Sequence, residues 1–89
     1  MPRIVFAPAI QRHVPSPVHD VDASTVGAAL GLAFAALPAL RGYILDDQGR
    51  LRRHLAVFVD GIAIHDRHQL SDPVGTTSEI YVAQALSGG

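Results

Sequence analysis

The chemical group that this sequence offers most openly is its terminal carboxylate, carried by Gly88-Gly89 after Leu86 and Ser87. Glycine is costly to order and has no side chain to pack, so it is typical of positions that need backbone freedom or close approach to another molecule. A terminal glycine also leaves the carboxyl carbon open to attack and lets the chain end enter a narrow channel. The alternative is a frayed or artificial chain end, because small residues are common there.

A second group of residues with reactive side chains is His65, Asp66 and His68, in the segment HDRH. Two histidines at positions i and i+3 bind zinc when a third ligand converges on them, and His54 or His13 would have to supply it. The segment has the composition of a surface loop, and nothing in the pattern dictates such a geometry. No nucleophile lies in a recognisable catalytic context either. We therefore expect neither a metal site nor catalytic residues in this chain.

The composition limits the class of protein. Eighty-nine residues, 48% hydrophobic and 17% charged, suit one folded domain and not a disordered chain. There is no cysteine, which excludes disulfides and thiolate metal sites within the chain and fits a reducing compartment. Seven arginines and no lysine oppose eight acidic residues, for a net charge of −1. Without a basic surplus to neutralise phosphates, nucleic acid is not an expected partner.

One segment raises the question of a membrane span. Residues 23–40 contain no charge and reach the lower length limit of a spanning helix. The segment is rich in alanine, contains two glycines and a proline, and supplies apolar residues without which the chain would lack a core. The first residues, MPRIVFAPAI, do not have the pattern of a secretory signal. We expect a buried helix, no membrane partner and a cytoplasmic protein.

Alternation of apolar and polar residues predicts four to five strands. The expected strands cover residues 3–11, an irregular stretch that ends near Val21, and residues 54–59, 62–64 and 79–86. Asp60-Gly61 predicts a two-residue hairpin turn between the third and fourth strands. Residues 65–78 are expected to form a polar loop from which Leu70 and Val74 reach the core.

One helix is predicted between the second and third strands. Asp22, Ser24 and Thr25 offer side-chain oxygens to its first turn, and Pro38 ends it. An apolar stripe recurs at helical spacing, at Val26, Leu30, Phe34 and Leu37. Residues 40–54, LRGYILDDQGRLRRH, are expected to be a connector with a turn at 47–49.

This order of elements indicates an α+β fold of two layers, because a single helix crosses one face of a mixed sheet. The ubiquitin-like β-grasp is the economical solution, with four to five strands and one main helix. Its last strand is central in the sheet, so the tail leaves a rigid platform. We expect a β-grasp domain over residues 1–85 and a flexible tail over residues 86–89.

The segment LPALRGYILDDQGRLRRHLAVFVDGIAI, together with the terminal Gly-Gly, resembles the ubiquitin-like sulfur carrier family, of the molybdopterin synthase small-subunit and thiamin sulfur-carrier type. The shared features are a helix closed by proline, an arginine-containing connector, an aspartate-rich glycine turn and a strand that runs into Asp-Gly. Here they are Pro38, Arg41, residues 46–49, residues 55–59 and Asp60-Gly61. The ending Leu86-Ser87 differs from the Ala-Gly-Gly common in molybdopterin synthesis, which leaves thiamin-type or secondary-metabolite sulfur transfer open.

The resemblance implies that the chain is a carrier and not itself an enzyme. A partner enzyme of the ubiquitin-activating type would consume ATP to convert the carboxylate of Gly89 into an acyl-adenylate. Sulfide or a persulfide would then displace AMP and leave a thiocarboxylate, from which a downstream synthase accepts the sulfur. Gly88 and Ser87 belong to the tail, which from residue 86 onward reaches about 13 Å beyond the sheet when extended. The chain would bind no cofactor of its own.

Docking of these partners is expected at an apolar surface close to the point where the tail leaves the sheet. Leu86 is the leading candidate for an anchor, and its alternative role is to pack inward as the last residue of the strand. Phe58 and Ile4 contribute if their face of the sheet is open.

Two other functions stay open at this stage. A ubiquitin-like protein modifier would use the same activated glycine but transfer it to a lysine of a target, giving an isopeptide bond. A non-catalytic β-grasp interaction module would bind its partner without Gly89. Deletion of Gly89 separates this module from the other two, because only they need activation.

Overall fold

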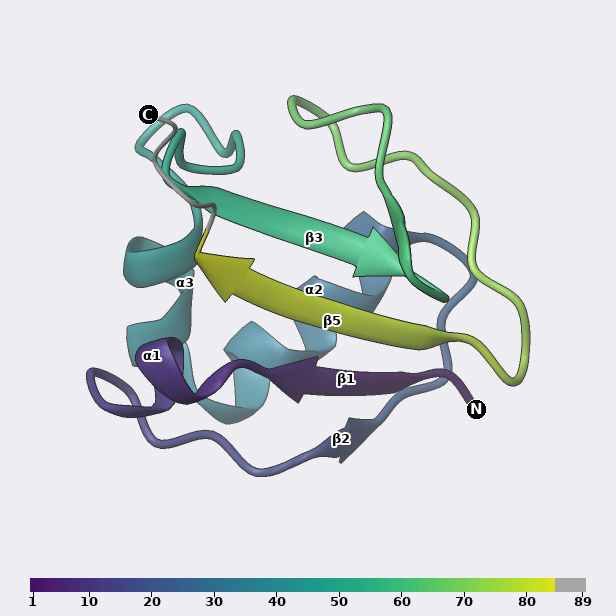
Figure 1. The fold of residues 1–89 in the computed structure, drawn as a ribbon, viewed down its shortest axis with the longest axis horizontal. Coiled ribbons are helices and arrows are strands. Elements are labelled where there is room, and N and C mark those ends of the chain that lie inside the picture. Colours follow the sequence, from purple (N-terminus) through teal and green to yellow (C-terminus); the bar gives the residue numbers. More distant parts are fainter. Residues whose placement is uncertain (85–89) are drawn as a thin grey trace.

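The computed structural model describes residues 1–84, which fold into a five-stranded sheet with helices (Figure 1). Along the chain the elements are β1 (Arg3–Phe6), α1 (Pro8–Gln11), β2 (His19–Asp20), α2 (Val26–Ala36), α3 (Pro38–Ile44), β3 (Leu55–Val59), β4 (Ile62–Ala63) and β5 (Glu79–Gln84). The predicted ubiquitin-like β-grasp fold of the α+β class is confirmed. Residue 85 and the predicted tail lie outside the described residues.

The last strand is central in the sheet, as predicted. The strand order is β2-β1-β5-β3-β4, with β5 parallel to β1 and antiparallel to β3. The short strands β2 and β4 form the two edges and pair antiparallel with β1 and β3. β5 is paired on both sides up to Val82, and from there to Gln84, its last residue, it is paired with β3.

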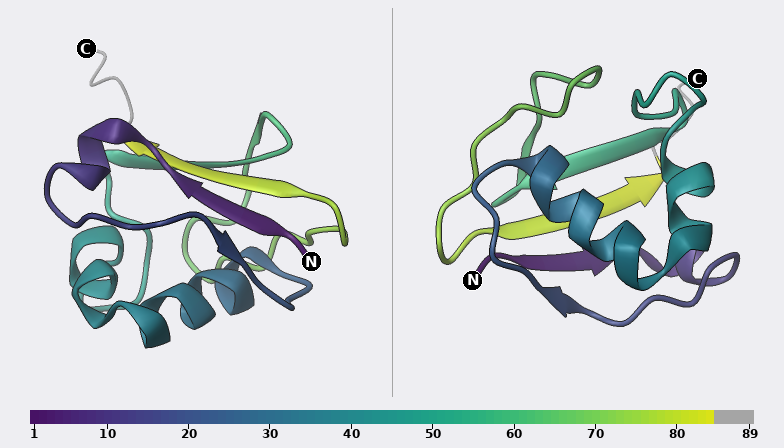
Figure 2. Two further views of the ribbon diagram at one scale, coloured as in Figure 1. Left: turned by 90° about the horizontal axis from the view of Figure 1, so that it is seen from below. Right: turned by 180° about the vertical axis from the view of Figure 1, so that it is seen from behind.

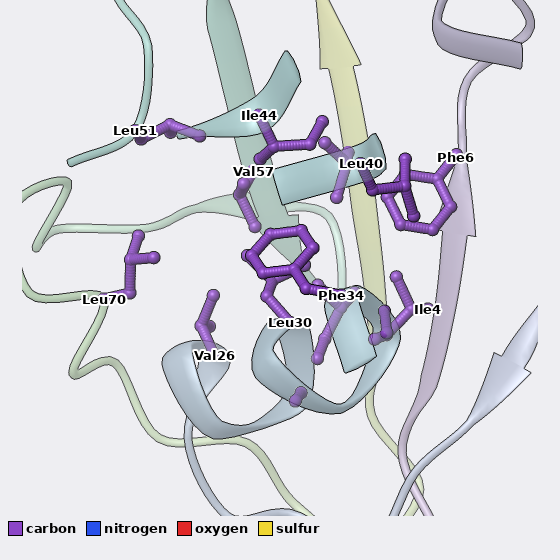
Figure 3. Close-up of a cluster of buried hydrophobic side chains, with 14 of the residues drawn as sticks. Ile4, Phe6, Val26, Leu30, Phe34, Leu40, Ile44, Leu51, Val57 and Leu70 are labelled. Atoms are coloured by element: carbon purple, nitrogen blue, oxygen red, sulfur yellow. The ribbon is translucent and has the colours of Figure 1, made fainter. Parts of the chain in front are cut away.

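The core lies between the sheet and the two longer helices, which cover the same face (Figure 2). Side chains from this face of the sheet, such as Ile4 and Val57, meet Leu30 and Phe34 of α2 and Leu40 of α3 (Figure 3). All of these side chains are at most 8% exposed. No helix among the described residues covers the other face of the central strands (Figure 2).

Helix α2 begins and is buried as its sequence predicts. The hydroxyl of Thr25 accepts a hydrogen bond from the amide of Ala28 at 3.1 Å and so caps the first turn. Val26, Leu30 and Phe34 are buried along one stripe. None of the helices within residues 1–84 is long and apolar enough to cross a membrane.

The predicted connector after Pro38 is partly wrong, because residues 38–44 form the helix α3. Proline ends α2 since its ring and missing N–H disfavour a helix interior, yet the same residue is well suited to the first position of a new helix. Leu40 and Ile44 of α3 are fully buried, which anchors it in the core. The turn that follows has Gly49 at a φ of +77°, as the predicted turn requires.

The predicted first strand is too long. Strand β1 ends at Phe6, and Pro8 begins the short helix α1. Proline cannot donate to a sheet ladder but is favourable at a helix start. Ile10 of α1 is fully buried and closes the core at this end of the sheet.

The two predicted loop features are confirmed. Asp60 and Gly61 have φ angles of +50° and +84°, as expected for a tight turn between β3 and β4. Leu70 is 4% exposed and belongs to the core, and Val74 packs against the core. Leu70 does so at a φ of +57°, an uncommon angle for a residue with a side chain. Its carbonyl accepts a hydrogen bond from the amide of Gly27 at 2.8 Å, which ties this loop to α2.

Candidate functional site

The residues predicted to carry the chemistry lie outside the described residues. These are Gly89 and Gly88, with Ser87 and the docking candidate Leu86. The structure describes the strand from which they continue and the surface around its end.

Strand β5 holds the start of the tail in place. It pairs with β1 over four residues and with β3 over five, and Gln84 lies opposite Leu55, the first residue of β3. Leu55 and Val82 are at most 1% exposed, so the paired strands β3 and β5 pack on the core at this end of the sheet. This arrangement fixes the position from which the chain continues toward Gly89.

Three side chains from distant parts of the sequence gather at the end of β5. The amide of Gln84 donates a hydrogen bond to the hydroxyl of Tyr43 at 3.1 Å. The ring of His13 stacks on Tyr43 with centroids 5.2 Å apart, and the ring of His54 meets Tyr43 edge-on at 6.4 Å. We call His13, Tyr43, His54 and Gln84 the exit cluster.

The exit cluster was not predicted from the sequence. The sequence pattern suggests His13 and His54 only as metal ligands and places Tyr43 in a connector. The one local signal is that His54 directly precedes the strand that pairs with the last strand. The contacts themselves depend on α1, α3 and β3 meeting at one end of the sheet.

An apolar row crosses the face of the sheet that carries no helix. Phe58 lies opposite Tyr81, and Tyr81 lies opposite Val5, so the three side chains share one face of three neighbouring strands. All three are half-buried, while Ala56 and Ala83 continue the face toward the end of β5. We call Val5, Phe58 and Tyr81 the open-face row. It is a surface against which another protein can pack.

Ile4 does not belong to this surface, which corrects the docking prediction. Its side chain is 0% exposed and points to the helices, because residues next to each other in a strand face opposite sides of the sheet. Val5 occupies the open face in its place. Phe58 is on the open face, as the prediction requires.

The histidine-rich loop is organised by hydrogen bonds. The carboxylate of Asp66 accepts bonds from the amides of His68 and Gln69 at 3.1 and 2.9 Å, and from the hydroxyl of Ser71 at 2.6 Å. The bond from the Gln69 amide is the largest of the effects that lower the pKa of Asp66 from 3.8 to about 2. Asp66 therefore stays ionised and shapes the loop.

The residues considered as a metal site are not brought together. His65 faces Asp72, at 3.2 Å from its ring Nδ1 to a carboxylate oxygen, whereas His13 and His54 lie in the exit cluster. Among residues 1–84 no group of three or more His, Cys, Asp or Glu side chains is arranged to hold a metal ion.

The structure resembles those of small ubiquitin-like proteins. Small archaeal modifier protein 1 from Haloferax volcanii is 27% identical, with a TM-score of 0.77 over 99% of this chain and 98% of that chain. A chain of the BexX/CysO complex from Amycolatopsis orientalis has a TM-score of 0.81 at 13% identity and full coverage of both chains. CysO from Mycobacterium tuberculosis, described as an antigen, has a TM-score of 0.80 at 13% identity, over 97% and 100% of the two chains.

No protein-family model matches the sequence, and no curated protein matches it in a sequence comparison. The identities of 13% support the fold alone, whereas the modifier from Haloferax volcanii matches in fold, in length and in about a quarter of its residues. The described residues thus have the fold of these proteins from end to end. The resemblance predicted from the sequence is confirmed: this chain is similar to the ubiquitin-like β-grasp carrier and modifier proteins.

Proposed function

We propose that this chain is a cytoplasmic sulfur carrier protein whose C-terminal Gly89 is adenylated and converted to a thiocarboxylate, which donates sulfur in cofactor or metabolite biosynthesis. The observation that carries the proposal is the joining of a Gly-Gly end to the central strand of a β-grasp sheet. The chain itself is the substrate of this chemistry, and its partners are the enzymes.

The length of the tail suits this role. Five residues follow Gln84, and in extended form they reach at most about 18 Å. That span is enough to deliver the carboxylate into the active site of another protein while the folded domain stays outside. Pairing with β3 up to Gln84 holds the point from which the tail starts.

The chemical steps balance without a cofactor on this chain. A carboxylate oxygen of Gly89 attacks the α-phosphorus of ATP, and pyrophosphate leaves. Hydrosulfide then adds to the acyl carbon, AMP leaves, and the terminal oxygen has been replaced by sulfur. In a downstream synthase the thiocarboxylate sulfur bonds to the acceptor; water then adds to the acyl carbon of Gly89, the C–S bond breaks, and the carboxylate is regenerated while the sulfur stays on the acceptor.

Docking would use the open-face row. Phe58 and Tyr81 are aromatic, half-buried and backed by the sheet, which is the kind of surface that provides anchors in protein interfaces. The face has no helix over it in the described part of the chain (Figure 2). Leu86 stays a predicted anchor.

The test is the intact mass of the chain after incubation with ATP, sulfide and the adenylating enzyme of its host. We expect a gain equal to the difference between sulfur and oxygen, and none in a variant that lacks Gly89. A Thr76→Ala variant, changed in an exposed loop at the other end of β5, is the matched control and should gain the same mass. An unchanged wild-type mass, with an enzyme proven active on its own carrier, would refute the proposal.

The alternative function is a ubiquitin-like modifier, conjugated through Gly89 to lysines of target proteins. It is favoured by the similarity to small archaeal modifier protein 1, at 27% identity over nearly the whole chain. Both functions begin with the same adenylate. A thiocarboxylate that accumulates and is consumed by a synthase supports the carrier, whereas a Gly-Gly isopeptide on target lysines supports the modifier.

A further inference from the structure

Charged side chains are separated along the length of the sheet. At the end where β5 stops, three arginines adjoin members of the exit cluster in the sequence, namely Arg12, Arg52 and Arg53. Arg12 precedes His13, and Arg52 and Arg53 precede His54, so all three belong to segments that contact or carry the exit cluster. These three guanidinium groups make this end of the molecule basic.

The opposite end of the sheet is acidic. Asp60 follows β3, and its carboxylate accepts a hydrogen bond from the amide of Glu79 at the start of β5. Asp20 lies beside them on β2, and the single arginine there, Arg3, is already paired with it at 3.6 Å. Asp20, Asp60 and Glu79 outnumber Arg3 and the N-terminal amine of Met1, which lines the same hollow as Asp20 and Glu79, so this end is the more acidic of the two.

The flanking arginines are not neutralised by carboxylates within residues 1–84. None of the three has an Asp or Glu oxygen within 4.0 Å among the described residues, although the chain has eight acidic residues. Arg52 instead donates to the carbonyl of Gly42 at 3.0 Å. Asp46, which lines the same hollow as Arg53, pairs with Arg50 at 3.2 Å, and Asp47 beside it is exposed.

A hollow of about 350 Å³ extends the basic surface beside Arg53. It is lined by Arg53, Arg50, Arg67 and His68, with Asp46 and Leu51. Arg67 donates to the carbonyls of Arg52 and Leu55 at 2.9 and 2.7 Å, which holds the segment before β3 in place. Cationic groups thus border the exit cluster on the α1 side and on the side of this hollow.

Any enzyme that acts on the terminal carboxylate must face this end of the molecule. The five residues after Gln84 reach at most about 18 Å, so the body of such an enzyme comes close to the exit cluster when it holds the chain end. Screening at physiological salt acts over about 8 Å, so charges on the two facing surfaces are felt at contact and during approach.

From these observations we infer that the exit cluster and its flanking Arg12, Arg52 and Arg53 form a docking surface for an acidic surface on the activating enzyme, next to the entrance of its active site. This inference rests on the proposed function and names the chemistry of its partner. Opposite charge there speeds productive encounter, while the acidic far end disfavours the reversed orientation. The open-face row supplies apolar contact area, and the arginines set the direction of approach.

The test measures adenylation by ATP–pyrophosphate exchange with the host's adenylating enzyme, at varied carrier concentration. The variants are Arg12→Gln and Arg53→Gln; Arg52 is left unchanged because its side chain donates to the carbonyl of Gly42. Arg3→Gln at the acidic end is the matched control. We expect each exit variant to raise KM for the carrier about threefold and the double variant about tenfold, with kcat unchanged. Arg3→Gln should leave KM unchanged. Raising salt should increase the wild-type KM and affect the double variant less.

The outcomes separate the two proposals. The docking surface is overturned, and the proposed function left intact, if the wild-type chain is adenylated but the double variant has an unchanged KM. The same holds if Arg3→Gln raises KM as much as the double variant does. A wild-type chain that is not adenylated by an active enzyme overturns the proposed function and the inference with it. Binding of a single-stranded RNA that is lost in the double variant, with no effect on KM, would assign the arginines to nucleic acid and overturn the inference.

Discussion

Phe58 and Ile4 lie on opposite faces of the sheet, so their substitution should separate partner docking from stability. Phe58 belongs to the open-face row, whereas Ile4 is fully buried against the helices (Figure 3). The matched pair of changes is Phe58→Ala and Ile4→Val. We expect the first to weaken activation of Gly89 and the second to lower only the free energy of unfolding.

The magnitudes follow from burial. Ile4→Val removes one methylene from a site that is 0% exposed, which costs about 1 kcal/mol of stability. A fully buried Phe→Ala change costs about 3–5 kcal/mol, and Phe58 is only half-buried, so about 1–2 kcal/mol is expected. Domains of this size are stable by roughly 5–15 kcal/mol, so both variants stay folded. If Phe58 is an interface anchor worth about 1.4 kcal/mol or more, its loss raises KM about tenfold.

The assay combines urea unfolding, followed by far-ultraviolet circular dichroism, with KM for the carrier in ATP–pyrophosphate exchange. Phe58→Ala should raise KM by far more than Ile4→Val, while their unfolding free energies differ little. Equal effects of both variants on KM would mean that activity follows stability. An unchanged KM in Phe58→Ala would remove the open-face row from the docking surface.

Three further predictions follow from local geometry. Leu70→Gly should be as stable as Leu70→Ala, or more stable by about 1 kcal/mol, because glycine adopts a φ of +57° without strain. A lower stability of the glycine variant in urea unfolding would contradict this. The pKa of Asp66 is lowered to about 2, so its stabilisation is complete above its ordinary value of 3.8 and lost as pH falls toward 2. The stability gap between wild type and Asp66→Asn should therefore shrink over that interval, and a constant gap would argue against it. Tyr43→Phe removes the hydroxyl that accepts the hydrogen bond of the Gln84 side chain, which should lower the free energy of unfolding by less than about 1 kcal/mol. Hydrogen exchange should become faster at the end of β5 but not at Ile80. Equal exchange rates in the variant and the wild type would show that this bond does not hold the strand end.

Predictions that depend on neighbours in sequence were confirmed. The Thr25 cap, the buried stripe of α2 and the Asp60-Gly61 turn each involve residues that are close together in the sequence. Their geometry is determined by backbone sterics and local hydrogen bonds, which the sequence shows directly. Proline was harder to interpret, because Pro8 and Pro38 end one element and begin the next, and both outcomes satisfy the same local rule.

The candidate site was predicted only in part. Alternation along β1 shows that Ile4 and Val5 face opposite ways, but it does not say which face the helices cover. The exit cluster unites residues 13, 43, 54 and 84, which no sequence spacing relates. The separation of charge between the two ends of the sheet is likewise invisible in a net charge of −1.

The sequence by itself determined the β-grasp order of elements, the helix that closes the core and the Gly-Gly end on which the proposed chemistry depends. These are properties of hydrophobic period, of turn residues and of the covalent chain end. Only the tertiary structure decided which face of the sheet is left open and which side chains surround the end of β5. Both depend on contacts between segments far apart in the chain, because burial of the apolar stripe of α2 selects one face of the sheet and leaves Phe58, Tyr81 and Val5 on the other.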